Sequence, residues 1–331
     1  MTRSLTTDHG LLTTDYQLSY TPDMPPALLM PSDILPKPPL HGRGLHWIIL
    51  PAAVAILLIG LFILLANVLK PSTPIEHELA AAMKSGMTGQ QRIELSRRLV
   101  DMIERPTHGQ PDTPLLLLSL GRIWQNPPRI PFEIEPARRK AVQTLLETLS
   151  SRDVSCRKAA TLALVACKGD PGTPIFVCRP LCDRLTDSTE DLDVRIAAAV
   201  TLGTICLPSD KTVIAALEQA RNLADERQSE LAWNASLALA RLGQPSATGT
   251  LLKLLDRHEL SQLIIYDRES DPRNPQPRKL TDYEIERFLV NAMEASSALP
   301  EPAVKSRLRQ LAQSDPSARV RTTASEILGR P

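Results

Sequence analysis

The chain of 331 residues has few aromatic side chains, and this scarcity limits its fold class. Phenylalanine, tryptophan and tyrosine together make up 3% of the residues, whereas hydrophobic residues of all kinds make up 43%. Strands of β-sandwiches and barrels favour aromatic and β-branched residues, so the composition argues against an all-β fold. The hydrophobic fraction is ample for a core, and we expect helices that pack through alanine and leucine.

The chain also lacks an excess of charge of either sign. It has 38 basic and 37 acidic side chains, which leaves a formal net charge of +1. This balance creates no overall field that would attract a polyanion. We therefore expect no nucleic-acid partner.

Motifs that carry catalytic or metal chemistry are missing as well. The sequence contains no glycine-rich phosphate loop, no His-Glu-x-x-His, no Gly-x-Ser-x-Gly and no Cys-x-x-Cys. Its six histidines are scattered, and no pair of them has the spacing of helical metal ligands. We expect no catalytic residues, no cofactor and no bound metal, so the chain is not predicted to be an enzyme.

The cysteines are odd in number, so one chain cannot pair all of them. They are Cys156, Cys167, Cys178, Cys182 and Cys206. The odd count favours a reducing compartment, and we interpret these residues as core or surface thiols. A metal or redox role is the minor alternative, because Cys178-x-x-x-Cys182 lacks a second Cys/His pair for a zinc site.

Only one long run without charge occurs, from Trp47 to Leu69. As a helix its 23 residues would span roughly 35 Å, enough for a hydrocarbon core of about 30 Å. We predict that residues 46–70 form a transmembrane helix that anchors the chain in a lipid bilayer. A signal peptide is the alternative, but its apolar core is shorter and begins nearer to the N-terminus.

The segment before this run, residues 1–45, has seven prolines between Pro22 and Pro39 and no sustained helical or strand period. We predict a disordered tail. Basic residues flank the apolar run about equally, so the positive-inside rule gives no orientation. Because a single N-terminal anchor more often places a large following domain outside, we favour a cytoplasmic N-terminus, although the unpaired cysteines favour the opposite.

After residue 70 the sequence pattern predicts helices separated by short loops. In residues 71–149 we predict helices near 75–84, 89–104, 115–124 and 137–149, with Thr88 as the N-cap of the second and Thr113 as the N-cap of the third. We interpret this part as degenerate repeats of the array that follows.

From residue 150 to residue 331 one helical pattern recurs. Its clearest copy comprises Asp191, Val194, Arg195, Ala197, Ala198, Leu202 and Gly203, and matching residues in other copies are Asp153, Arg157, Val320, Arg321 and Leu328. Shorter helices near 175–185, 213–223, 250–255 and 303–311 separate the copies, so each unit is predicted to be a helical hairpin. The paired alanines would let neighbouring helices approach closely.

These residues resemble the HEAT-repeat family, in particular the short bacterial type that is also found in phycobilisome lyases. Departures from the pattern include Ala232 at the position of Arg195 and Val165 at that of Gly203. The resemblance implies an all-α fold, an α-solenoid of about five to six HEAT-like hairpins. Together with the predicted anchor, it implies a single-pass membrane protein.

The function implied is that of a scaffold or adaptor for protein–protein interaction, acting as an accessory subunit of a membrane complex with other proteins as its partners. Two alternatives remain open. One is a bilin lyase-like enzyme, which bound pigment would reveal, and the other is a single-pass regulatory receptor. The last repeat helix stops without a polar cap in the sequence, so we also expect another chain to cover the final face.

A polar insertion at residues 258–279 interrupts the repeat spacing. It joins an apolar stretch to a charged run, which would either present an anchor to a partner or complete its own repeat and then extend into solvent. The candidate partner-binding residues are Leu260, Ile264, Ile265, Tyr266, Arg268 and Arg273.

The signature aspartates Asp153 and Asp191 each lie four residues before an arginine, Arg157 and Arg195. We interpret each aspartate as an N-cap and each arginine as one partner of a solvated salt bridge, worth about 0.5 kcal/mol.

Overall fold

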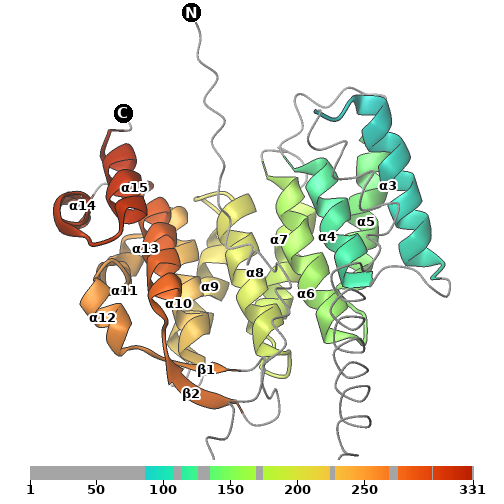
Figure 1. The fold of residues 1–331 in the computed structure, drawn as a ribbon. Helices are drawn as coiled ribbons and strands as arrows, with labels where there is room; N and C mark the ends of the chain where they lie inside the picture. The colour runs from blue at the N-terminus through green and yellow to red at the C-terminus, as the bar shows by residue number, and fades with distance from the viewer. Residues whose placement is uncertain are drawn as a thin grey trace, which may run out of the picture. The chain divides into compact units, whose positions relative to one another are not determined.

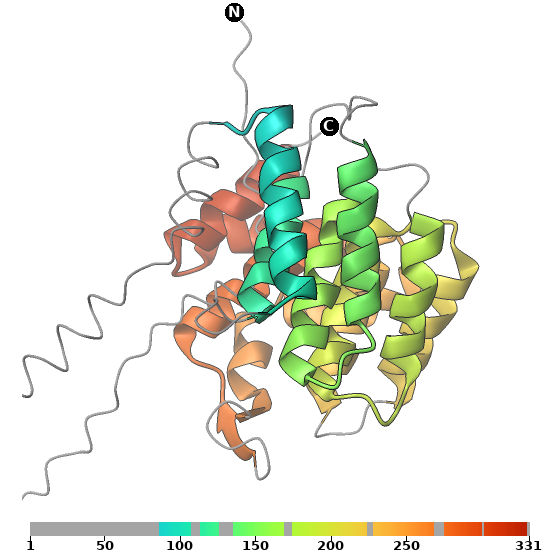
Figure 2. The same cartoon turned by 90° about the vertical axis from the view of Figure 1, so that its right-hand side faces the viewer.

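The computed structural model describes residues 86–106, 113–125, 135–168, 174–223, 228–267, 275–299 and 301–329, all of which belong to one compact unit (Figures 1 and 2). This part of the chain is 78% helical and contains 13 α-helices, so the all-α class is confirmed. The predicted tail, the predicted anchor Trp47–Leu69 and the predicted helix at 75–84 lie outside the described residues. No helix within those residues is long and apolar enough to cross a membrane.

The elements follow one another with short connections. The α-helices are α3 (Gly89–Glu104), α4 (Thr113–Trp124), α5 (Glu135–Thr148), α6 (Val154–Ala163), α7 (Pro174–Thr186), α8 (Leu192–Ile205), α9 (Lys211–Leu223), α10 (Ser229–Arg241), α11 (Thr248–Leu254), α12 (Arg257–Gln262), α13 (Asp282–Ser296), α14 (Pro302–Ser314) and α15 (Ala318–Leu328). Two 3₁₀ helices, η1 (Leu164–Cys167) and η3 (Pro245–Ala247), and two strands, β1 (Ile264–Asp267) and β2 (Gln276–Lys279), complete the set.

The helices pack in pairs. Helices α4, α6, α8, α10, α13 and α15 contact one another in this order, and each also contacts the helix that precedes it in the chain. Contacts between α3 and α5 and between α7 and α9 join the partners of successive pairs. Each pair therefore buries its apolar side against the next pair, as the sequence periodicity predicted.

The helix starts follow from local capping. Thr88 caps α3 and forms a reciprocal pair with Gln91, whose amide nitrogen lies 3.3 Å from the threonine hydroxyl. Asp153 accepts the Ser155 amide hydrogen bond (2.7 Å) at the start of α6, and Asp191 accepts that of Asp193 (2.9 Å) at the start of α8. The predicted N-caps at these three positions are confirmed, whereas Thr113 lies within α4 as its first residue.

Small residues let the second helices of successive pairs approach closely. A Cβ atom on Gly121 of α4 would lie 2.8 Å from the Cβ of Ala163 in α6, and one on Gly203 of α8 would lie 2.6 Å from the Cβ of Ala238 in α10. These contacts join the last turns of α4 and α6 and those of α8 and α10, and near the ends of α6 and α8 the Thr201 hydroxyl donates to the Thr161 carbonyl at 3.0 Å. The C-terminal ends of α4, α6, α8 and α10 therefore lie on the same side of the array.

Helix α8 is enclosed on nearly every side. The signature residues Val194, Ala197, Ala198, Leu202 and Gly203 are all buried. A Cβ atom on Gly203 would meet the backbone of α10, so α8 packs closely against this neighbour. In α15 the matching Val320 is also buried, and Leu328 is half-buried.

The described part of the insertion at 258–279 contains regular secondary structure, which neither of the two interpretations of its sequence included. Its first residues lie in α12, and β1 and β2 then form an antiparallel hairpin in which Ile264 pairs with Lys279 and Tyr266 pairs with Pro277. The expectation of a segment extending into solvent was wrong for these residues.

The last helix pair has a polar outer face. The exposed residues of α14 and α15 include Lys305, Arg309, Gln313, Thr322 and Glu326, and no large hydrophobic side chain is exposed between residues 301 and 329. Such a face is typical of a capping repeat. The expectation that another chain covers the final face stays a prediction.

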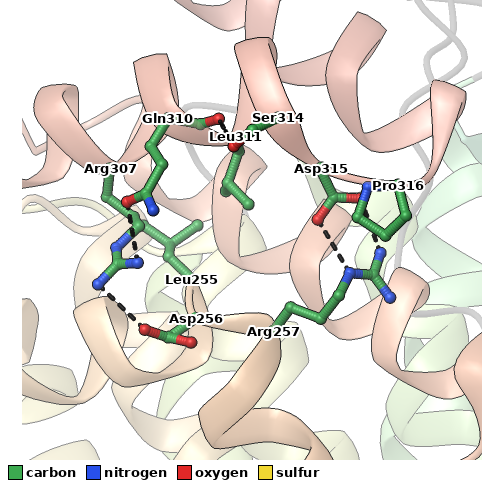
Figure 3. A pocket seen from close by; sticks show the side chains of 9 residues that line it. All are labelled: Leu255, Asp256, Arg257, Arg307, Gln310, Leu311, Ser314, Asp315 and Pro316. Carbon is green, nitrogen blue, oxygen red and sulfur yellow. Dashed lines mark hydrogen bonds and ion pairs between the residues drawn. The ribbon is translucent and has the colours of Figure 1, made fainter.

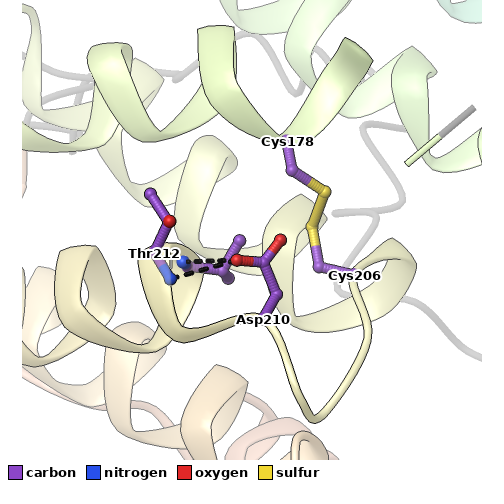
Figure 4. Close-up of a disulfide and its surroundings, with 5 residues drawn as sticks. Cys178, Cys206, Asp210 and Thr212 are labelled. Carbon is purple, nitrogen blue, oxygen red and sulfur yellow. Dashed lines mark hydrogen bonds between the residues drawn. A yellow bond between two sulfur atoms is a disulfide. The ribbon is translucent and has the colours of Figure 1, made fainter. Parts of the chain in front are cut away.

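Two cysteines are paired, contrary to the interpretation of all five as thiols. Cys178 of α7 and Cys206 at the end of α8 form a disulfide (Figure 4). The other three are buried free thiols. Burial raises the pKa of Cys156 to about 11 and that of Cys182 to about 12, with nearby aspartates adding to each shift. These thiols are therefore chemically inert at neutral pH.

Candidate interaction surface

The structure separates the six candidate residues of the insertion. Leu260 and Ile265 are buried in the core, at 0% and 8% exposure, so they support the hairpin and offer nothing to a partner. Ile264 is 52% exposed, and Tyr266 is half-buried. Arg268 and Arg273 lie outside the described residues.

The hairpin is fixed to α13 by an ion pair at the helix start. Arg278 of β2 donates two hydrogen bonds to the Glu284 carboxylate, at 2.7 and 2.8 Å. Glu284 also accepts from the backbone amide and the hydroxyl of Thr281, both at 2.8 Å. Burial alone would raise the pKa of Glu284, but these donors outweigh it and lower the pKa to about 2. The carboxylate therefore stays ionised and holds the orientation of the hairpin.

Aromatic side chains lie on α10 and on α13, the helix that Arg278 of the hairpin contacts. The rings of Trp233 in α10 and Phe288 in α13 meet edge to face, with their centroids 6.0 Å apart. Tyr283, at the start of α13, is 61% exposed, and the Arg287 guanidinium lies 5.7 Å from the centroid of its ring. None of these rings is fully buried.

This distribution stands out against the low aromatic content of the chain. The aromatic side chains within the described residues are Trp124, Phe176, Trp233, Tyr266, Tyr283 and Phe288, and the last four of these lie on α10, the hairpin and α13. We call Trp233, Ile264, Tyr266, Tyr283 and Phe288 the hairpin surface. The sequence interpretation missed three of its members, although the rarity of aromatic residues was itself a signal.

The signature arginines act within the array. Arg157 donates to both oxygens of Glu190 in the next helix pair, with a shortest distance of 2.6 Å, and the Glu190 side chain is 2% exposed. Arg184 reaches the same carboxylate at 3.1 Å. Burial would raise the pKa of Glu190, but hydrogen bonds from Arg157 and from the Asp191 amide lower it overall. The prediction of a solvated salt bridge was therefore wrong at Arg157.

These arginines also donate to carbonyl groups in the last turn of the preceding helix or just after it. Arg157 donates to the carbonyl of Ser151 at 2.9 Å, Arg195 to that of Leu185 at 3.0 Å, and Arg321 contacts the carbonyls of Asp315 and Pro316. Helix ends leave such carbonyls without intrahelical partners, and a cation there is favourable. The signature arginines are thus structural.

A shallow pocket of about 160 Å³ lies between the α11–α12 turn and α14 (Figure 3). Arg257 donates two hydrogen bonds to Asp315, at 2.8 and 2.9 Å, and Arg307 lies 3.1 Å from Asp256. Each charged side chain of the pocket already has a partner of opposite charge. Within the described ranges, no group of three or more histidine, cysteine or acidic residues is placed to hold a metal ion.

Comparisons with known proteins add little to this geometry. No family model matches the chain, and no curated protein matches it. A solved structure to which it is similar is that of an engineered protein from the Northeast Structural Genomics Consortium. The two share 18% sequence identity over 78% of this chain and 96% of the other, with a TM-score of 0.35. Similarity at this level carries no argument about function.

Proposed function

We propose that this protein is a membrane-tethered scaffold or adaptor. In this proposal an α-solenoid of HEAT-like hairpins, anchored by Trp47–Leu69, presents a surface to another protein of a membrane complex. The stacked helix pairs support a repeat array. The anchor rests on the 23-residue uncharged run of the sequence.

The hairpin surface is the observation that carries the binding role. Tyrosine and tryptophan are enriched where proteins bind one another, because a rigid ring buries a large area at a small cost in conformational entropy. Here four of the six aromatic side chains in the described residues lie, exposed or half-buried, on α10, the hairpin and α13, in a chain with 3% aromatic residues. The Arg278–Glu284 pair holds the hairpin in place, which lowers the entropy cost of binding.

The disulfide supports an orientation with the repeats outside the cytoplasm. Disulfides persist in oxidising compartments and are rare where thiols are kept reduced. The odd cysteine count no longer opposes this orientation, because the three cysteines outside the disulfide are buried. Their thiols are thus kept from intermolecular pairing.

Affinity purification of the full chain from solubilised, crosslinked membranes tests the binding role. The Tyr283→Ser and Ile264→Ser variants remove exposed apolar groups of the hairpin surface. Leu223→Ser is the matched control, since Leu223 is 68% exposed but lies at the end of α9. A partner should be retained by the parent and the control, and its yield should fall about tenfold with Tyr283→Ser. Equal recovery with all variants would contradict the proposal.

A further inference from the structure

Two large apolar side chains are exposed beside the disulfide. Phe176 is 75% exposed and lies two residues before Cys178, and Leu207 is 60% exposed and directly follows Cys206. The disulfide joins the first turns of α7 to the end of α8 (Figure 4). Because the bond brings these two chain segments together, both apolar groups lie at the same end of the helix pair.

This end of the array is also where α3 begins. Arg92 in the first turn of α3 donates to the Ile123 carbonyl at the end of α4. Arg138 in the first turn of α5 donates to the Ala166 carbonyl, just after α6, at 3.1 Å. Since the ends of α4, α6 and α8 lie on one side, the starts of α3, α5 and α7 lie there too. We call this side the disulfide end.

Exposed basic residues also lie at this end. Arg122, Lys168 and Lys211 are at helix termini of the disulfide end, and Arg179 directly follows Cys178 in the second turn of α7; all four are exposed. None of them forms an ion pair with another residue in the part of the chain that the structure describes. The disulfide end thus presents unneutralised positive charge next to apolar groups.

Two acidic side chains that the structure describes at these helix termini are already engaged. Asp210, at the start of α9, accepts hydrogen bonds from the amides of Thr212 and Val213, at 3.0 and 3.2 Å. Glu135, at the start of α5, is paired with Arg139 at 2.9 Å. Both carboxylates are half-buried, so they do little to offset the exposed cations.

We propose that the disulfide end is a lipid-facing surface that rests on an anionic bilayer. This inference rests on the proposed anchor, because Leu69 precedes the first described residue by only the 16 residues 70–85. Apolar side chains beside cations are the combination that binds the headgroup region of anionic membranes. The chain enters the array at this end, so the tether holds the surface close to the lipid.

Tryptophan fluorescence of the full chain in lipid nanodiscs tests this contact. Phe176→Trp places an indole on the disulfide end, and Leu223→Trp places one at the opposite end of α9, where Leu223 is 68% exposed. Brominated lipids quench an indole that reaches the acyl region. In anionic nanodiscs, the fluorescence added at position 176 should be quenched about twofold or more relative to that added at position 223.

A charge reversal tests the attraction between the basic residues of the disulfide end and anionic lipid. Arg179→Glu together with Lys211→Glu should lower the quenching at position 176, as should replacing the anionic lipid by a zwitterionic one. Lys253→Glu together with Lys305→Glu is the matched control, because these lysines are exposed on α11 and α14, and it should leave the quenching unchanged. Far-UV circular dichroism verifies that each variant keeps its helices.

The outcomes separate this inference from the proposed anchor. If the parent chain fails to remain with the nanodisc, the anchor is wrong and the inference falls with it. If the chain remains and Trp47 is quenched, but positions 176 and 223 are quenched equally or not at all, the anchor stands and the lipid-facing surface is rejected. An anionic bilayer would also be rejected as the ligand if quenching at position 176 stayed the same after the charge reversal and in zwitterionic lipid.

Discussion

Glu190 illustrates how single residues connect successive helix pairs. Its side chain is 2% exposed, and it accepts hydrogen bonds from Arg157, from Arg184 and from the Asp191 amide at 2.8 Å. Removing a buried carboxylate leaves its arginines without a counter-charge, which costs more than an exposed ion pair contributes.

We therefore expect Glu190→Gln to lower the free energy of unfolding of the full chain by about 2–4 kcal/mol, measured by denaturant titration in detergent. The control is Glu135→Gln, which breaks the Arg139–Glu135 pair, whose side chains are 76% and 35% exposed. This control should change the free energy by less than about 0.5 kcal/mol. Equal effects of the two substitutions would contradict an inter-repeat role for Glu190.

Glu284 makes the stability of the folded chain at the hairpin depend on pH. Its pKa is lowered from 4.5 to about 2 in the folded chain, so folding favours the ionised form. The stabilisation is complete above the unfolded-state pKa of 4.5 and is lost as pH falls from 4.5 towards 2.

We expect Glu284→Gln to lower stability at pH 7 by on the order of 1–3 kcal/mol, and the difference from the parent to vanish as the pH approaches 2. Denaturation midpoints across this pH range provide the measurement. Glu326→Gln, at an exposed position of α15, should leave the profile unchanged. A difference that persists undiminished at low pH would show that the substitution acts through packing.

The residue scale also shows which contacts a sequence can predict. Asp153 was predictable as an N-cap because its partners are the amides of Ser155 and Cys156, two and three residues along the chain. The partner of Arg157 was not, because Glu190 lies 33 residues away and only the packing of two helix pairs brings them together. The sequence therefore predicted a solvated salt bridge for Arg157, whereas its partner carboxylate is buried.

At the scale of elements, close helix packing depends on individual glycines. A Cβ atom on Gly203 would lie 2.5 Å from the Cα of Ala238, a backbone atom that cannot move without shifting α10. Gly249 of α11 offers the opposite case, because a Cβ atom there would meet nothing within 4 Å.

We expect Gly203→Ala to destabilise the chain by about 2–3 kcal/mol or more, since α8 and α10 must separate. Gly249→Ala should stabilise it by up to about 1 kcal/mol, because alanine is the better helix former. Thermal unfolding followed by circular dichroism measures both. Tolerance of alanine at position 203 would contradict the close approach of these helices.

The hairpin was the element that the sequence did not predict. Strand β2 is Gln-Pro-Arg-Lys, which has no β-branched or aromatic residue and contains a proline. It is held as a strand by pairing with β1 and by the Arg278–Glu284 contact to α13. The helices, in contrast, carry an apolar period and local caps, so their limits were predicted closely.

At the scale of the whole molecule, successive pairs are joined by packing and by polar contacts. Lys158 of α6 lies 2.7 Å from Asp193 of α8, and Ser317, the N-cap of α15, donates to Glu286 of α13 at 2.8 Å. The disulfide acts differently, because it joins the two helices of one pair through residues 28 positions apart. In the proposed membrane-anchored protein it also bears on the orientation of the array.

The state of the cysteines in the cell therefore tests the orientation of the whole chain. The thiols are trapped with acid and then alkylated in denaturant. If the repeats lie outside the cytoplasm, only the three cysteines outside the disulfide should be labelled before reduction. After reduction, Cys178 and Cys206 should be labelled as well. The buried thiols should stay unoxidised, since the thiolate is the reactive form and burial raises the pKa of Cys156 and Cys182. Cys206→Ser should add one labelled cysteine, Cys178, before reduction; a disulfide re-formed with Cys182 would contradict the pairing. Labelling of every cysteine of the parent before reduction would place the repeats in a reducing compartment and reverse the proposed orientation.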